Sequence, residues 1–294
     1  MNMNKNIVLI GILVFAFFTI GVMNNRQSQI QESITYFPND PNVTYTSTNT
    51  SIHFQKLQKS DKYLLKWQIG SILDRKAYLR QDIGLLFSNG RLIAKQGYWK
   101  QNTDHLIQER EIVGRESALV QALSFHYAEL HENDEKIFSS QKMSADQIYI
   151  ANLQNQAFHS FRNAFSKQEQ EWKQKLDQHT KEFLYHSWEK GIRSFSINPE
   201  QYVSFPLTDL FLNPSSSFPG FTEQETNRII GSLWEGLYKN YFLGIKKADG
   251  TKVKPIGSTI PLILIAKDKS HLLVLTETAN GEPTLLRQMI GYGH

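Results

Sequence analysis

The sequence predicts an α+β fold: antiparallel hairpins at both ends of a soluble domain, two amphipathic helices between them, and one transmembrane helix at the N-terminus. Three observations predict this arrangement. An uncharged apolar run covers residues 7–23. Strand-like segments and turn dipeptides fill residues 62–153 and 244–277. Between them, two segments with helical spacing each begin at a capping box.

The apolar run at residues 7–23 is long enough to cross a membrane. At about 1.5 Å per residue it forms about 25 Å of helix, the short end of what spans a hydrocarbon core of about 30 Å. A cleaved signal peptide would end in small residues in an A-x-A-like pattern, and the only suitable pair is Thr19 and Gly21. We therefore expect an uncleaved signal anchor.

The flanking charges predict the orientation of this anchor. Lys5 precedes it and Arg26 follows it, but residues 27–55 contain no Lys or Arg. Because positive charges favour the cytoplasmic side, we expect a cytoplasmic tail at residues 1–6 and a C-terminal domain outside the cytoplasm of a bacterial cell.

The rest of the chain divides into a spacer and a domain. Residues 24–51 are rich in Asn, Gln, Ser and Thr and predict a flexible linker. Residues 52–294 then form the domain, with a candidate lobe boundary in the proline-rich segment 196–221.

The first half of the domain is predicted to be mostly strands. The segment at 82–99 is the clearest hairpin, because Asn89-Gly90 suits a two-residue turn between apolar strands. A short helix is expected over 114–123. Further strands are expected over 62–70, 105–113, 125–131 and 146–153.

The two helices have clear start signals. Ser166 with Glu169 forms the first capping box, and Gly191 is the expected end of that helix. Thr222 with Glu225 forms the second capping box. The C-terminal part follows with hairpins over 244–254 and 259–277, the second made of interior strands, and a short helix over 283–290.

Composition excludes several kinds of chemistry. The chain has no Cys, so it has no disulfide, no thiol nucleophile and no cysteine metal site. Its 32 Lys and Arg against 28 Asp and Glu leave a net charge of +4. Basic residues concentrate in 56–80 and 246–269. If these two segments share a face, they form a basic patch for an anionic lipid or wall polymer. The absence of a nucleic-acid-binding motif disfavours a nucleic-acid partner.

His126, Glu129 and His131 form the group that most resembles a metal site. In a strand, alternation sends His126 to one face and the other two residues to the opposite face. Their spacing also differs from H-E-x-x-H. The sequence therefore predicts no metal site here.

Two short fragments resemble penicillin-recognising serine enzymes. Ser139 and Lys142 have S-x-x-K spacing, and Tyr238 with Asn240 is similar to that family's second motif. The family's K-T-G element is absent, so we assign no catalytic residue from this resemblance.

Aromatic residues of the second helix have two interpretations. Trp234, Leu237, Tyr238 and Tyr241 recur at helical spacing and could form a ligand platform, but core packing explains them better. Glu235 and Lys239 are a favourable exposed pair.

These patterns predict a single-pass envelope protein whose outer domain binds a partner protein, an anionic wall or lipid surface, or a small signal. They assign no cofactor and do not indicate an enzyme. One alternative is an envelope hydrolase whose acids or histidines converge only in the fold. Another is a structural subunit of a membrane complex, with small residues Gly11, Ala16 and Gly21 in the span.

Overall fold

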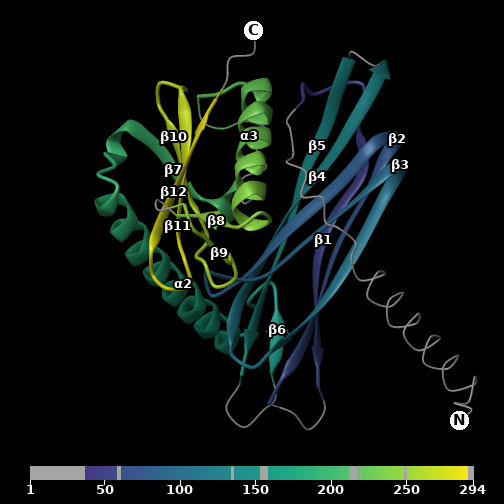
Figure 1. Cartoon of the computed structure of the whole chain (residues 1–294). Coiled ribbons are helices and arrows are strands. Elements are labelled where there is room, and N and C mark those ends of the chain that lie inside the picture. Colours follow the sequence, from purple (N-terminus) through teal and green to yellow (C-terminus); the bar gives the residue numbers. More distant parts are fainter. Residues whose placement is uncertain are drawn as a thin grey trace, which may run out of the picture. The chain divides into compact units, whose positions relative to one another are not determined.

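The computed structural model describes residues 37–57, 61–133, 136–152, 158–211, 218, 220–247 and 250–290. The described chain is mostly β, with 54% strand, 23% helix and only two α-helices (Figure 1). The predicted α+β class is therefore wrong. Strands of up to 26 residues take the place of the short separate hairpins that local patterns predicted.

The first sheet contains six strands, all paired antiparallel. They are β1 (Tyr45–Lys56), β2 (Tyr63–Ser88), β3 (Arg91–Gly114), β4 (Ala118–Asn133), β5 (Lys136–Ala151) and β6 (His159–Phe161). One edge of β2 pairs with β3 along most of its length. The other edge pairs with β1 over residues 63–73 and with β4 over residues 79–88, so β2 joins the two halves of the sheet.

The predicted turn at Asn89-Gly90 is confirmed. Both residues have positive φ angles, 46° and 82°, as a two-residue hairpin turn requires. Asn89 also accepts a hydrogen bond from Leu119 N at 2.9 Å through Oδ1. The turn residue therefore connects the β2–β3 hairpin to the start of β4.

The β2–β3 hairpin bends and folds back on itself. Its pairing shifts register between Ile72 and Ala77. Past this bend the two halves pack face to face, because a Cβ on Gly84 would lie only 2.7 Å from Trp67 Cζ2. The curled sheet thus encloses its own apolar core, which includes Ile52, Leu65, Trp67, Ile69, Leu86, Val120, Ala122, Ile148 and Ile150.

Side chains also connect the two halves of the curled sheet. Gln108 Nε2 donates to Asp82 O at 2.7 Å, and Arg110 Nη1 donates to Lys95 O at 2.6 Å. These bonds satisfy main-chain carbonyls where the sheet curls.

Side chains bridge β1 and β5 at the place where the curled sheet would close. Ile52 N donates to Asp146 Oδ2 at 2.7 Å, and Ile52 O accepts from Arg162 Nη2 at 2.8 Å. Arg162 also pairs with Asp146 at 2.7 Å. We call this contact the Asp146–Arg162 bridge. It replaces a strand ladder, since β1 and β5 are not paired strands in the described sheet.

A second sheet contains four strands in the order β12-β11-β10-β7. They are β7 (Tyr202–Pro206), β10 (Leu262–Ala266), β11 (His271–Glu277) and β12 (Pro283–Met289). The predicted interior hairpin is confirmed, because β10 and β11 are its central, buried strands. Short 3-10 helices η1 (Pro199–Gln201) and η2 (Leu207–Phe211) flank β7, and β8 (Ile245–Lys246) pairs with β9 (Lys252–Val253).

Both predicted helix starts are confirmed. Helices α2 (Lys167–Ser194) and α3 (Glu223–Tyr241) begin after Ser166 and Thr222, and each has a complete capping box. These starts were predictable because capping depends on residues only three positions apart.

The predicted end of the first helix at Gly191 is wrong. Helix α2 continues to Ser194, and Gly191 is buried within it. A Cβ at this position would lie 2.6 Å from Leu275 Cδ1 of β11. Glycine therefore serves close packing against the second sheet.

Glu169 in the first capping box makes stability depend on pH. Its carboxylate accepts from Ser166 N at 2.9 Å and lies 2.9 Å from His159 Nε2. The Ser166 backbone N–H first, and His159 second, lower the pKa of Glu169 to about 2. Because the folded state binds this proton more weakly, the stabilisation is complete above the unfolded pKa of 4.5 and is lost as pH falls toward 2.

We expect Glu169→Gln to remove this dependence. The stability advantage of the wild type over the variant should be largest at neutral pH and shrink between about pH 4.5 and pH 2. Urea unfolding at several pH values measures it. Glu171→Gln, an exposed change in the same helical turn, is the control. An equal pH trend in both variants would contradict the assignment.

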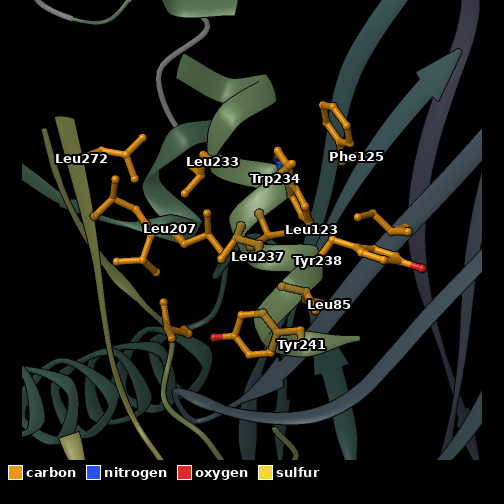
Figure 2. Close-up of a cluster of buried hydrophobic side chains, with 14 of the residues drawn as sticks. Leu85, Leu123, Phe125, Leu207, Leu233, Trp234, Leu237, Tyr238, Tyr241 and Leu272 are labelled. Carbon is orange, nitrogen blue, oxygen red and sulfur yellow. The ribbon is translucent and has the colours of Figure 1, made fainter. Parts of the chain in front are cut away.

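Helix α3 lies between the two sheets and packs against both (Figure 2). Trp234 stacks on Phe125 of β4 with ring centroids 5.3 Å apart. Leu233 and Leu237 belong to the same cluster as Leu272 of β11. This cluster joins the outer face of the curled sheet to the second sheet.

Two further predicted helices are strands. Residues 118–123, within the helix predicted at 114–123, start β4, and the segment at 283–290 holds β12. The adjacent residues Leu119 and Val120 of β4 are both buried, and they belong to different apolar clusters. A strand covered on both faces loses its alternation, which is why its apolar run resembled a helix.

The predicted linker also differs from the structure. Residues 45–51 were assigned to the flexible spacer, but they belong to β1 and pair with β2. The Thr and Ser residues that alternate along this segment form a strand of the curled sheet, whereas their composition alone indicated a linker.

The transmembrane helix is not supported. None of the helices in the described ranges is long and apolar enough to cross a membrane. The predicted anchor at 7–23 and tail at 1–6 lie outside the described residues. The predicted location outside the cytoplasm stays a prediction.

Candidate functional site

A polar cluster lies inside the curled sheet, near its bend. Arg80 and Asp82 of β2 both have side chains that are 0% exposed and form an ion pair at 3.7 Å. Arg80 Nη1 donates to Asp104 O at 2.7 Å. Ser71 lies between the two charges, because it accepts from Arg80 Nη2 and donates to Asp82 Oδ2. The pair is thus buried with hydrogen bonds on both partners.

His126 of β4 extends this cluster toward β5. Its Nδ1 lies 3.0 Å from Asp82 Oδ2, and its Nε2 lies 2.7 Å from Ser144 Oγ. Ser144 is partly exposed, whereas His126 is fully buried. A serine, a histidine and an aspartate therefore form one hydrogen-bonded chain, which we call the Ser144–His126–Asp82 triad.

Two more hydroxyl groups, one from β1 and one from β4, complete the cluster. Thr50 Oγ1 of β1 donates to Ser124 Oγ at 2.6 Å and lies 2.6 Å from Ser144 Oγ. Members of the cluster thus come from β1, β2, β4 and β5. Such a network favours one arrangement of these strands.

Tyr45 covers the charged end of the cluster. The Arg80 guanidinium lies over its ring at 4.9 Å, and the His126 ring lies 6.1 Å away. Burial raises the pKa of Tyr45 well above its usual range, although the nearby Arg80 charge opposes this. Among the described residues, the buried Tyr45 hydroxyl, Arg80 Nε and Asp82 Oδ1 have no hydrogen-bond partner. Each such atom carries a desolvation cost.

The structure separates the residues that the sequence grouped as metal-like. His126 points into the curled sheet, and Glu129 and His131 lie together away from it, with His131 Nε2 2.5 Å from Glu129 Oε1. His131 also stacks on Tyr78 at 3.9 Å. Within the described ranges, no group of three His, Asp or Glu could hold a metal ion.

The fragments resembling penicillin-recognising enzymes do not converge. Ser139 is buried, and its Oγ donates to Phe37 O at 2.7 Å, whereas Lys142 is exposed. Tyr238 lies on α3 in the core and stacks on Phe242. The two fragments therefore share no site.

The aromatic residues of the second helix are core residues. Trp234, Leu237, Tyr238 and Tyr241 all belong to the cluster between the sheets, as core packing predicted. Glu235 and Lys239 form the expected exposed pair at 2.7 Å.

Some basic residues of the two segments are buried or paired with carboxylates. Arg80 is buried, and Lys66 pairs with Glu109 at 2.9 Å. Lys269 pairs with Glu225 at the start of α3, whereas Lys246 follows the end of that helix.

Part of the outer edge of β3 is exposed. β3 lies at the margin of the curled sheet and pairs only with β2, apart from one bridge at Arg91 (Figure 1). Residues 97–102 are all exposed, including Tyr98 at 51% and Trp99 at 53%. We call residues 97–101 the β3 edge. It ends at Asn102, whose positive φ of 49° interrupts the extended backbone.

The same hairpin exposes two isoleucines on its outer face. Ile107 lies opposite Gly70 and is 65% exposed, and Ile72 is 49% exposed two pairs further along. Because Gly70 has no side chain, nothing on β2 covers Ile107 at this position.

Comparisons with family models, curated proteins and solved structures give no match for this chain.

Sequence reasoning missed Asp82 and Ser144 and counted Arg80 as a surface charge. One signal was available: in β2, Arg80 and Asp82 alternate in phase with the buried Gly84 and Leu86. Polar residues in the buried phase of a strand indicate an internal network.

Proposed function

We propose that this protein binds a partner protein by adding an extended segment of the partner to the β3 edge. The observation that carries this proposal is the exposed stretch of residues 97–101, which pairs with β2 on one edge and has no strand partner on the other edge among the described residues. An unpaired edge presents N–H and C=O groups that pair readily with another strand.

The side chains of the β3 edge suit a protein interface. Tyr98 and Trp99 are about half exposed, and tyrosine and tryptophan are enriched where proteins bind each other. Lys100 is the one charged residue between 97 and 101. A neutral or acidic partner segment is therefore favoured.

The anionic-surface alternative has less support, because several lysines of the two basic segments are paired with carboxylates. A role as a structural subunit depends on the span at 7–23, which lies outside the described residues.

Trp99→Ala tests the proposal. We expect this variant to bind the partner segment at least about 30-fold more weakly, the loss typical of a central aromatic contact. Its folding stability should change by no more than about 0.5 kcal/mol, because the side chain is exposed.

The partner segment can be found with a photo-crosslinking amino acid placed at position 100 of the full chain in its native host. The same amino acid at Tyr185, exposed on α2, is the control position. The segment captured from position 100 is then synthesised with N-methyl groups on alternate amides. N-methylation should abolish binding, since it removes strand hydrogen bonds.

Three results would contradict the proposal: no specific crosslink from position 100, equal crosslinks from both positions, or binding that survives N-methylation. A crosslinked homodimer would identify the partner as a second copy of this chain.

A further inference from the structure

We propose that the Ser144–His126–Asp82 triad is also a catalytic site for hydrolysing carboxylic esters, with Ser144 as nucleophile and His126 as general base. This activity goes beyond partner binding and does not depend on it. The distances of 2.7 and 3.0 Å lie within the reach needed for proton transfer.

Charge balance assigns the proton on His126. Arg80 and Asp82 are fully buried and cancel each other, so a charged imidazole would leave a net positive charge in the core. A neutral His126 stabilises the Asp82 carboxylate only if Nδ1 carries the proton and donates to Oδ2. Its Nε2 is then free to accept the Ser144 proton, which is the tautomer a general base requires.

Ser144 is the member of the triad that reaches the surface. It is partly exposed, and it lies on the edge of β5 that pairs with β6 only at residues 149–151. Near Ser144, side chains alone connect β5 to β1, through Thr50 and the Asp146–Arg162 bridge. Separation of these side chains opens a route to Ser144 without breaking a strand ladder.

Each step of the reaction balances. Ser144 Oγ forms a bond to the ester carbonyl carbon, and its proton passes to His126 Nε2. The C–O bond to the alcohol then breaks, and the alcohol leaves with that proton. Water then attacks the acyl-serine and gives a proton to His126 Nε2, which passes it to Ser144 Oγ as the acyl–oxygen bond breaks. This releases the carboxylic acid and restores Ser144. Asp82 acts as a positioning residue, because it holds the tautomer of His126.

Thr50 competes with His126 for the Ser144 proton. Since Thr50 donates its own proton to Ser124, the Ser144 hydroxyl has two neighbouring acceptors, Thr50 Oγ1 and His126 Nε2. Thr50→Val removes the competing acceptor, so it should not slow the reaction of Ser144.

The experiment uses the full chain and a fluorophosphonate probe, which forms a phosphorus–oxygen bond to an activated serine and releases fluoride. Mass spectrometry locates the label. We expect label on Ser144, a loss of at least about 100-fold in labelling rate in His126→Gln, and no loss in the control His53→Gln, the same substitution at an exposed histidine of β1. Arg162→Gln, which breaks the Asp146–Arg162 bridge, should label faster than the wild type.

A second measurement does not depend on how the variants fold. In wild-type protein with ¹⁵N-labelled histidine, the nitrogen chemical shifts report which ring nitrogen of His126 carries the proton. We expect the proton on Nδ1.

Any of three results would overturn the proposal. The first is absence of label on Ser144 in both the wild type and Arg162→Gln. The second is equal labelling in wild type and folded His126→Gln. The third is a proton on Nε2 of His126, which would make the triad a purely structural network.

Discussion

Asp82→Ala is expected to cost about 3–5 kcal/mol of folding stability, the largest loss from any single charge in this protein. The variant leaves Arg80 fully buried with no anion beside it. Asp104 O and Ser71 can still accept its hydrogen bonds, but they do not neutralise its charge. The total free energy of unfolding of a folded domain is only about 5–15 kcal/mol, so this loss is a large part of it.

Urea unfolding followed by tryptophan fluorescence measures the loss. Asp104→Ala is a matched control, because it removes the same charge from an exposed side chain and keeps the carbonyl that binds Arg80. Its expected cost is below about 1 kcal/mol.

A double variant separates the charge effect from the loss of packing. Arg80→Met with Asp82→Asn removes both charges together and should cost less than Asp82→Ala alone. If Asp82→Ala costs no more than Asp104→Ala, the buried pair does not have the energetic role assigned to it.

Trp234→Ala is expected to lower the free energy of unfolding by about 3–5 kcal/mol. The side chain is fully buried, stacks on Phe125 at an interplanar angle of 12°, and donates Nε1 to Met143 Sδ at 2.9 Å. It belongs to the apolar cluster that contains residues of both the curled sheet and the second sheet (Figure 2). Its removal leaves a cavity at the contact that joins them.

The control for this prediction is Trp99→Ala, the same substitution at a side chain that is 53% exposed. Trp234→Phe should lie between the wild type and Trp234→Ala, because it keeps an aromatic ring beside Phe125. Equal costs for the two tryptophan-to-alanine variants would show that burial between the sheets is not what stabilises this region.

The elements that could be predicted are those specified by neighbouring residues. The turn at Asn89-Gly90 and the capping boxes at Ser166 and Thr222 involve residues at most three positions apart, so their local chemistry determined them. The interior hairpin of β10 and β11 was also predictable, because two apolar runs flank a short polar turn.

The candidate site could not be predicted, because its members meet only after the sheet curls. His126 is 44 residues from Asp82 and 18 from Ser144 in the chain. Each sits in a segment that reads as an ordinary strand. The bend near Ile72 brings Ser71 into contact with Asp82. No local sequence pattern predicted that the hairpin would fold back on itself.

By itself, the sequence determined the absence of cysteine chemistry, the tight turn at Asn89-Gly90 and the places where α2 and α3 begin. Only the tertiary structure decided that long strands replace the predicted short helices, that Arg80 is a buried partner of Asp82, and that Ser144 meets His126. The physical reason is range: turns and caps are satisfied within a few residues, whereas burial, charge pairing and strand pairing depend on neighbours that the folded chain supplies.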